Sequence, residues 1–251
     1  MNKEEICDLL QQKEGKMDLP IPLQEGKFID LRDCGHLFVS GIANSGKSNA
    51  LRCFLASLLV NRAGDVKLFI YDPKRIEYSP FGTRKEMLFP VIYEADEAKE
   101  CLLKVKDEME RRFSLMEASD CCDIDEYREK AEKLPYIVIG IDEVAALGEE
   151  EGAFDALFLL LAKGRAAGIH VIATSSRFVS LPKRIADNFS ARIALTQSSY
   201  EDSKRFIGVN DAADMLEHGA GLFRCRFLGK AKPFKVKLPK ISVSEAKTAL
   251  E

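Results

Sequence analysis

The chain has 251 residues, 46% of them hydrophobic and 31% charged, and a formal net charge of −3. This is the composition of an ordinary globular protein, and the length suits one full α/β domain with a large core. The charge balance gives no global sign of nucleic-acid affinity, so any contact with nucleic acid must come from a local patch.

The sequence has no sign of export or of direct membrane insertion. No apolar run reaches the roughly eighteen residues that a membrane span needs, and the first twenty residues are too polar for a secretory signal. Seven cysteines occur without a C-x-x-C pair, and the three histidines lie far apart. We therefore expect a cytoplasmic protein with reduced thiols and no histidine or cysteine metal site.

The N-terminal segment is predicted to be a leader that lies against the domain. Residues 1–17 have the pattern of a short amphipathic helix, and Pro20 and Pro22 impose an extended chain after it. We expect this leader to occupy residues 1–26 and a single domain to occupy residues 27–251, with a short strand at 27–30.

Residues 41–48 have the spacing G-x-x-x-x-G-K-S, after an apolar run at 36–40 that predicts a buried strand and before a segment of helical spacing. A glycine-rich turn before a helix is the alternative, but agreement at all eight positions favours a phosphate-binding loop. Its backbone N–H groups surround an anion, Lys47 reaches the β- and γ-phosphates, and Ser48 ligates Mg²⁺. The expected contacts of a nucleoside triphosphate are Gly41, Ile42, Ala43, Asn44, Ser45, Gly46, Lys47, Ser48 and Asn49.

Strands and helices alternate through the rest of the chain, which predicts an α/β fold with a mostly parallel central sheet and helices on both faces. The strand expected at 169–174 ends at Thr174 and Ser175, where a polar side chain can sense a γ-phosphate. The other expected elements are strands at 66–71, 88–93, 191–196 and 221–225 and helices at 95–116, 153–167, 199–207 and 212–217.

Residues 134–141 form an apolar, β-branched run that is followed by Asp142 and Glu143. Such a run predicts a central parallel strand with two carboxylates at its functional end. We expect Asp142 to join Ser48 in the Mg²⁺ shell and Glu143 to polarise the attacking water.

A basic segment lies near the C-terminus, where residues 219–240 contain seven lysines and arginines and no acidic residue. It predicts either a contact with nucleic-acid phosphates or an edge strand that lysines protect from aggregation. Lys74 and Arg75 are further candidates for contact with nucleic acid.

With these motifs, the chain resembles the motor domain of the FtsK/SpoIIIE family of DNA translocases. The resemblance spans about residues 19–225 and rests on His36–Ser48, Tyr71–Pro80, Leu134–Glu143 and Gly164–Thr174. It implies a RecA-like P-loop fold, hydrolysis of ATP with Mg²⁺, and a ring of identical subunits, usually hexameric, that moves double-stranded DNA.

In such a ring a neighbouring subunit contributes an arginine to each ATP site. The resemblance makes Arg192 the first candidate and Arg165 the second, because a cation arriving from the neighbour stabilises charge on the transferring phosphoryl group. A structural ion pair is the alternative for either residue.

Two positions depart from the family pattern. Ser175 replaces the usual glutamine, and Lys204 replaces an arginine, so the coupling of hydrolysis to movement is expected to differ. We expect a bare motor, without the membrane-spanning and winged-helix regions of chromosome translocases, from a mobile element or DNA-transfer system that supplies a recruiting or membrane-anchoring partner. The alternatives are a type VII-like secretion ATPase that moves protein, and a nucleotide-binding assembly subunit with little turnover.

Overall fold

The computed structural model describes residues 1–12 and 15–251. Among these residues, seven strands form one central sheet in the order β4-β5-β6-β3-β7-β8-β9. The strands are β3 (Leu37–Ser40), β4 (Val66–Tyr71), β5 (Tyr136–Ile141), β6 (Ile169–Ser175), β7 (Ala191–Ala194), β8 (Ala220–Cys225) and β9 (Lys230–Lys237).

The strands from β4 to β7 run parallel to one another, and β8 and β9 continue the sheet as an antiparallel pair. Every residue of β3 and of β5 is buried, as expected for apolar strands that are covered on both faces. This arrangement confirms the α/β, RecA-like P-loop fold. Because β3 lies between β6 and β7, the loop that follows it leaves the middle of the sheet's carboxyl edge.

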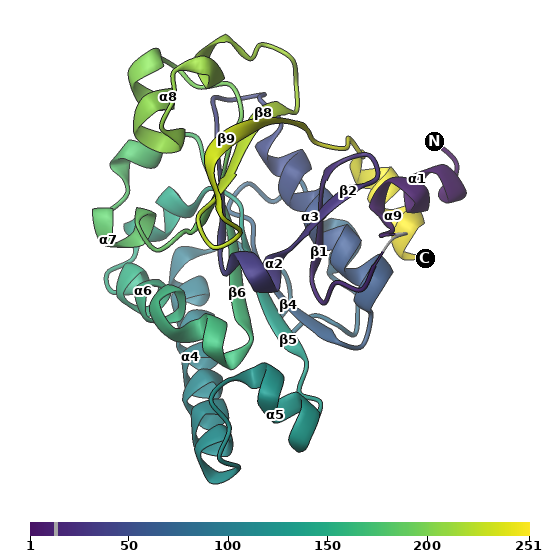
Figure 1. Cartoon of the computed structure of the whole chain (residues 1–251), viewed down its shortest axis with the longest axis vertical. Coiled ribbons are helices and arrows are strands. Elements are labelled where there is room, and N and C mark those ends of the chain that lie inside the picture. Colours follow the sequence, from purple (N-terminus) through teal and green to yellow (C-terminus); the bar gives the residue numbers. More distant parts are fainter. Residues whose placement is uncertain (13–14) are drawn as a thin grey trace.

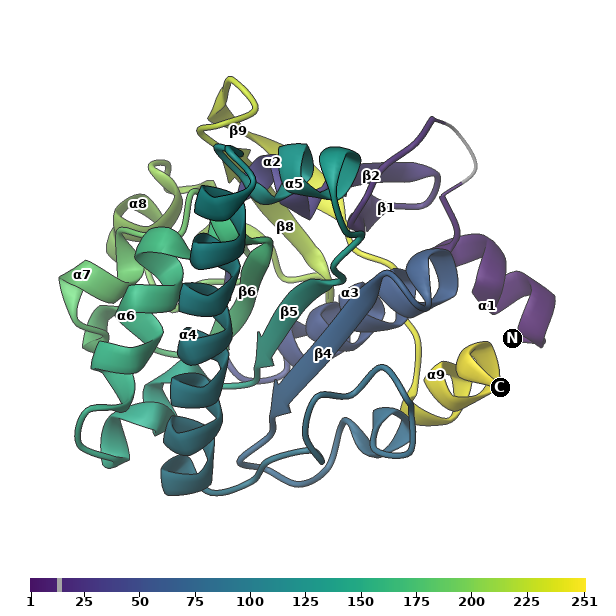
Figure 2. The same ribbon diagram turned by 90° about the horizontal axis from the view of Figure 1, so that it is seen from below.

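Helices cover both faces of the sheet (Figures 1 and 2). Helix α3 (Lys47–Arg62) lies on one face, and α4 (Ala95–Ala118) packs with α6 (Ala153–Lys163) on the other. The shorter helices of the described chain are α2 (Leu31–Cys34), α5 (Ile124–Lys130), α7 (Lys183–Ala186) and α8 (Tyr200–Ile207).

The outer side of α3 is covered by the two ends of the chain. Helix α1 (Lys3–Leu10), the hairpin of β1 (Pro20–Gln24) and β2 (Lys27–Asp30), and helix α9 (Val243–Leu250) all contact it. The hydroxyl of Ser57 on α3 donates to Leu10 O at 2.8 Å and Pro20 O at 3.0 Å, which joins α1 and β1 to the helix. The segment expected to lie against the domain is therefore packed on its core.

The boundary that the sequence analysis placed between residues 26 and 27 falls in the turn of the β1–β2 hairpin. Residues 13 and 14 of the expected leader lie outside the described residues. In the part of the chain that the structure describes, no helix is both long and apolar enough to cross a membrane.

The prediction of a strand at 88–93 is wrong. Only isolated bridges form there, from Leu68 to Met87 and from Tyr71 to Ile92. Between them stands Pro90, which has no N–H to donate, so a continuous ladder cannot form. The helix expected at 212–217 is also wrong, because the chain makes only a short 3₁₀ turn at Asp211–Asp214.

Candidate nucleotide site

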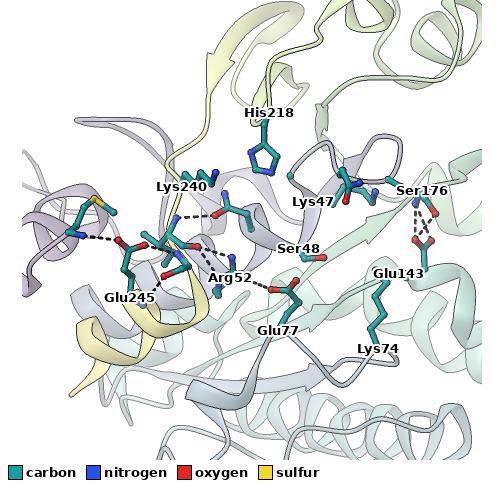
Figure 3. Close-up of a pocket in the computed structure, with 17 residues that line it drawn as sticks. Lys47, Ser48, Arg52, Lys74, Glu77, Glu143, Ser176, His218, Lys240 and Glu245 are labelled. Atoms are coloured by element: carbon teal, nitrogen blue, oxygen red, sulfur yellow. Dashed lines mark hydrogen bonds and ion pairs between the residues drawn. The ribbon is translucent and has the colours of Figure 1, made fainter.

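A pocket opens at the carboxyl edge of the sheet, where the loops after β3, β4, β5 and β6 converge (Figure 3). Lys47 and Ser48 reach it from the first turn of α3, Lys74 from the loop after β4, and Glu143 and Ser176 from the ends of β5 and β6. Side chains far apart in the sequence thus meet at one sheet edge, as ligand sites of parallel sheets do.

Two glycines give the phosphate-binding loop its shape. Gly46 has φ +108°, a conformation that side chains rarely adopt, and a Cβ there would approach the His218 ring at 3.1 Å. A Cβ on Gly41 would lie 2.5 Å from Ser45 Oγ and 2.9 Å from Leu195 Cβ. The chain can therefore wrap tightly over the start of α3 only with glycine at both positions.

The loop fits an anion that its own chain does not supply. Ser45 is 4% exposed, and its hydroxyl has no hydrogen-bond partner within the described residues. A buried hydroxyl without a partner costs free energy, and a phosphate oxygen at the N-terminus of α3 would satisfy it.

Lys47 is held inside this loop. Its ammonium donates to Gly41 O and Ile42 O, each at 2.8 Å, and the residue is 6% exposed. Burial lowers the pKa of Lys47, and the nearby charge of Glu143 opposes that shift. The ammonium must exchange these carbonyls for phosphate oxygens to act as the sequence predicts.

Ser48, Asp142 and Thr174 form one hydrogen-bonded set. The Ser48 hydroxyl donates to Asp142 Oδ2 at 3.0 Å, and the Thr174 hydroxyl donates to Oδ1 at 2.8 Å. Lys74 Nζ lies 3.5 Å from the same carboxylate, which is fully buried. Mg²⁺ is usually bound by carboxylate and hydroxyl oxygens together with substrate phosphates. The residues of this set therefore fit that ion.

Thr174 lies behind the two carboxylates. Its side chain is fully buried, and its hydroxyl accepts from Glu143 N at 3.0 Å while it donates to Asp142. This position suits orientation of both acidic residues, whereas the predicted γ-phosphate contact requires a side chain that faces the pocket.

Glu143 projects into the pocket from a strained backbone. Its φ is +72°, in the left-handed region that non-glycine residues rarely occupy. The carboxylate accepts hydrogen bonds from Ser175, at the end of β6, and from Ser176. Figure 3 shows the contact with Ser176. Ser175 thus reaches Glu143, the residue predicted to polarise water.

Asn49 has a different partner from the one expected. Its amide donates to Pro239 O at 2.8 Å, and its oxygen accepts from Ile241 N at 3.0 Å. Arg52, one turn further along α3, donates to Ile241 O at 2.7 Å and pairs with Glu77. These side chains fasten the C-terminal segment to the start of α3, so a nucleotide contact by the Asn49 side chain remains a prediction.

The same segment supplies pocket residues that the sequence analysis missed. The pocket is lined also by Lys240, Ile241, Ser242, Glu245 and His218, and Figure 3 shows Lys240 and Glu245 on the side away from Glu143. No motif identifies them, because a chain end that folds back over a distant helix leaves no fixed spacing in the sequence.

The two arginines expected to act on a neighbour's nucleotide both contact their own chain. Arg192 donates to Ala186 O at 2.7 Å and Phe206 O at 3.0 Å, and burial lowers its pKa to about 10. The Arg165 guanidinium lies 4.7 Å from the centre of the Phe227 ring, near the amino end of β6. Neither is among the described residues that line the pocket, and their action in trans remains a prediction.

The basic segment includes an edge strand. β9 is the last strand of the sheet and carries Pro233 and exposed lysines at 230, 232, 235 and 237. Lysine and proline on an edge strand oppose pairing with other chains, so this arrangement favours the protective interpretation of the basic residues.

Comparison with known proteins identifies one family. The FtsK/SpoIIIE family profile matches residues 10–217. DNA translocase FtsK of Staphylococcus epidermidis is 34% identical over 78% of this chain and 26% of its own length. FtsK of Halalkalibacterium halodurans is 32% identical over 98% of this chain and 34% of its own length, and DNA translocase SftA of Bacillus subtilis is 33% identical over 83% and 23%. The chain therefore spans about a quarter to a third of these curated relatives.

Solved structures show the same fold. The pCW3 conjugation coupling protein TcpA, solved with ATPγS, superposes with a TM-score of 0.73 at 25% identity, over 84% of this chain and 62% of that one. The cytoplasmic domain of the type VII secretion ATPase EccC from Thermomonospora curvata gives a TM-score of 0.79 at 17% identity, over 99% and 34%. At that identity the second likeness supports the fold alone.

Proposed function

This chain belongs to the FtsK/SpoIIIE family, and on that premise we propose that it hydrolyses ATP with Mg²⁺ and uses the reaction to move double-stranded DNA. The observation that supports this proposal most directly is the connected set of Ser48, Asp142, Thr174 and Glu143 beneath the phosphate-binding loop. Candidate metal ligands and a candidate base are joined there by hydrogen bonds at one sheet edge.

In the proposed reaction, Glu143 accepts a proton from the water that attacks the γ-phosphorus. The bond from that phosphorus to the bridging oxygen of ADP breaks, and ADP leaves with the bonding electron pair. Lys47 holds the β- and γ-phosphate oxygens. Ser48 and Asp142 would hold Mg²⁺, which would supply positive charge beside the transferring phosphoryl group. Thr174 positions both acidic residues, since its hydroxyl donates to the Asp142 carboxylate and accepts from Glu143 N.

With the phosphates at the loop, the nucleoside end of the substrate extends toward the C-terminal segment. His218, Lys240 and Ser242 surround that side of the pocket. We expect His218→Ala to raise the KM for ATP by several-fold with little change in kcat, since it removes a contact made equally in the ground and transition states.

The proposed assembly is a ring of identical subunits in which Arg192 or Arg165 of one copy reaches the nucleotide of the next. Mixing two inactive variants, Glu143→Gln and Arg192→Ala, tests this arrangement. If Arg192 acts in trans, mixed rings contain some sites with both native residues and regain activity. If neither this mixture nor the equivalent Arg165 mixture regains activity, neither arginine acts in trans.

The similarity to a conjugation coupling protein supports a role in DNA transfer for a mobile element, with a recruiting or anchoring partner. All seven cysteines are free thiols, which suits the reducing cytoplasm in which such a motor would act.

The experiment that tests the proposed function is steady-state ATP hydrolysis with and without long double-stranded DNA. We expect strong stimulation by DNA that Lys47→Ala abolishes and that Lys163→Ala, an exposed lysine at the end of α6, retains. ATP binding without hydrolysis, unchanged by DNA, would exclude the translocase and favour a nucleotide-binding assembly subunit. Hydrolysis that responds to a protein substrate and not to DNA would favour a secretion ATPase.

A further inference from the structure

Both oxygens of the Glu143 carboxylate accept hydrogen bonds from Ser175 and Ser176 of its own chain. Oε1 accepts from Ser175 Oγ at 2.7 Å and Ser176 N at 3.1 Å, and Oε2 accepts from Ser176 N at 3.0 Å and Ser176 Oγ at 2.7 Å. Three hydrogens make these four contacts, because the Ser176 N–H is shared between the two oxygens. With both oxygens bonded, an attacking water must compete with these donors to pass its proton to the carboxylate.

The backbone of Glu143 is fixed independently of these contacts. Its φ and ψ are both +72°, and its N–H donates to the fully buried Thr174 hydroxyl at 3.0 Å. A strained conformation of this kind persists only where surrounding contacts determine it. Release of the carboxylate therefore requires movement on the serine side of the contact.

The serine side is attached to an exposed loop. Ser175 Oγ also accepts from Arg177 N at 3.1 Å, and Ser176 and Arg177 are both exposed. The next turn, Phe178–Ser180, is anchored by the Phe178 ring, 4.9 Å from the Phe206 ring, while Val179 is 53% exposed. Displacement of this loop would move the donors of Ser175 and Ser176 away from Glu143.

We propose that Ser175 and Ser176 are positioning residues that withhold Glu143 from water, and that contact of DNA with the loop 176–180 releases it. The exposed guanidinium of Arg177, next to Ser176, gives a DNA phosphate a cation to bind. This inference rests on the proposed function and adds to it a means of restraining hydrolysis until DNA is bound.

The test is the double variant Ser175→Ala/Ser176→Ala, assayed with and without DNA. Hydrogen bonds to a charged group contribute enough that losing two hydroxyl donors should raise the DNA-free rate by about tenfold. The ratio of the DNA-stimulated to the DNA-free rate should fall by a similar factor. Ser175→Thr/Ser176→Thr, which keeps both hydroxyls, should return that ratio toward the native value.

Two controls accompany this variant. Ser114→Ala removes an exposed hydroxyl from α4, away from the pocket and the loop 176–180, where it donates to Glu110 O at 3.2 Å, so both rates should stay native. Adding Glu143→Gln to the double alanine variant should remove the gain in DNA-free hydrolysis, because that gain is attributed to the released carboxylate.

Equal falls of the two rates in the double alanine variant would overturn the inference, since the serines would then hold Glu143 in its productive position. Unchanged rates would also overturn it. The proposed function is judged separately. If DNA fails to stimulate hydrolysis by the native protein, the translocase proposal is contradicted. A rise in DNA-free hydrolysis in the double variant would still support the inference that the serines withhold Glu143 from water. If Ser175→Ala disturbs folding, Ser176→Ala alone at the exposed position provides the same comparison.

Discussion

The two ends of the neighbouring strands β3 and β6 have opposite chemistry. At the carboxyl end, where Ser40 and Ser175 are paired, the carboxylates of Asp142 and Glu143 accept hydrogen bonds from serine and threonine hydroxyls beside an open pocket. At the amino end, His36 and His170 lie sealed in the core with their rings 6.2 Å apart. One end of the strand pair is built for charged substrates and the other for neutral packing.

Hydrogen bonds across the strands fix the two imidazoles. His36 Nδ1 accepts from Val171 N at 3.0 Å, and His170 Nδ1 donates to Gly35 O at 2.7 Å. His170 Nε2 has no partner in the described chain. Burial lowers the pKa of His36 to about 3 and of His170 to about 4, each aided by the charge of Arg165.

The contrast between the two strand ends predicts its largest mutational effect at Glu143. We expect Glu143→Gln to lower kcat by about 10²–10⁴-fold, the range that a positioned general base contributes, with ATP affinity and unfolding free energy close to native. Rapid-quench hydrolysis and nucleotide-binding titration measure these quantities. A rate within a few-fold of native would remove Glu143 from the role of base.

Thr174 tests how the carboxyl end is held together. Thr174→Val keeps the shape of the side chain but leaves Asp142 and the Glu143 N–H without their shared partner, so Mg²⁺ affinity should fall by about 10–100-fold. Hydrolysis measured over a Mg²⁺ titration gives the shift. Thr174→Ser, which restores the hydroxyl, should return the titration to the native position, and a native titration for the valine variant would contradict this role.

The histidines predict the pH dependence of stability. In the unfolded chain each takes up a proton near its ordinary pKa of 6.5, whereas in the folded chain both stay neutral down to about pH 4. The unfolded state therefore binds more protons as the pH falls below 6.5, and stability is lost at about 1.4 kcal/mol per pH unit for each histidine. This loss develops between pH 6.5 and 4 and is absent above pH 7.5.

Urea unfolding of native protein, His170→Gln and His218→Gln between pH 4.5 and 8 measures that effect. His170→Gln should be less stable at pH 8 but should have a shallower dependence on pH. The pKa of His218, at the pocket, is also lowered, by partial burial and by the charges of Lys240 and Lys237, so its variant should have a slope between those of native protein and His170→Gln. Equal slopes for all three proteins would show that the buried histidines do not titrate in this way.

Arg165, at the amino end, should have the smallest effect on stability. Its described contact is with the ring of Phe227, and an exposed cation–π contact is worth about 0.5–1 kcal/mol. Thermal unfolding of Arg165→Ala measures this cost. A large fall in hydrolysis without a comparable fall in stability would instead support its action on a neighbouring subunit.

The sequence predicts most of the carboxyl end because each part of that site is local. The phosphate-binding loop and Asp142-Glu143 each follow an apolar strand, and the spacing of a few residues identifies the chemistry. Parallel strand order then brings the two together. The bond from Ser48 to Asp142, which joins residues 94 positions apart, agrees with the metal-site prediction.

Other features depend on contacts that no local pattern records. The hydrogen bonds of Ser175 and Ser176 to Glu143 arise from the register of β6 against β5, and the sequence shows only that a longer glutamine is missing. Asn49 is a second example: its place after the loop predicts a nucleotide contact, which remains a prediction, but no local pattern indicates the bonds of its amide to residues 239 and 241. Pro90 was present in the run expected to be a strand, and its missing N–H was the overlooked signal.

The bonds from Asn49 and Arg52 to Ile241 also link nucleotide occupancy to amide exchange at the other end of the chain. Any ligand that steadies the first turn of α3 also steadies the acceptor of the Ile241 N–H, and by thermodynamic reciprocity a firmly seated C-terminal segment strengthens binding. Deuterium uptake at the Ile241 amide should therefore slow as the nucleotide site fills. Exchange at this one backbone amide would then report the fraction of sites that are occupied.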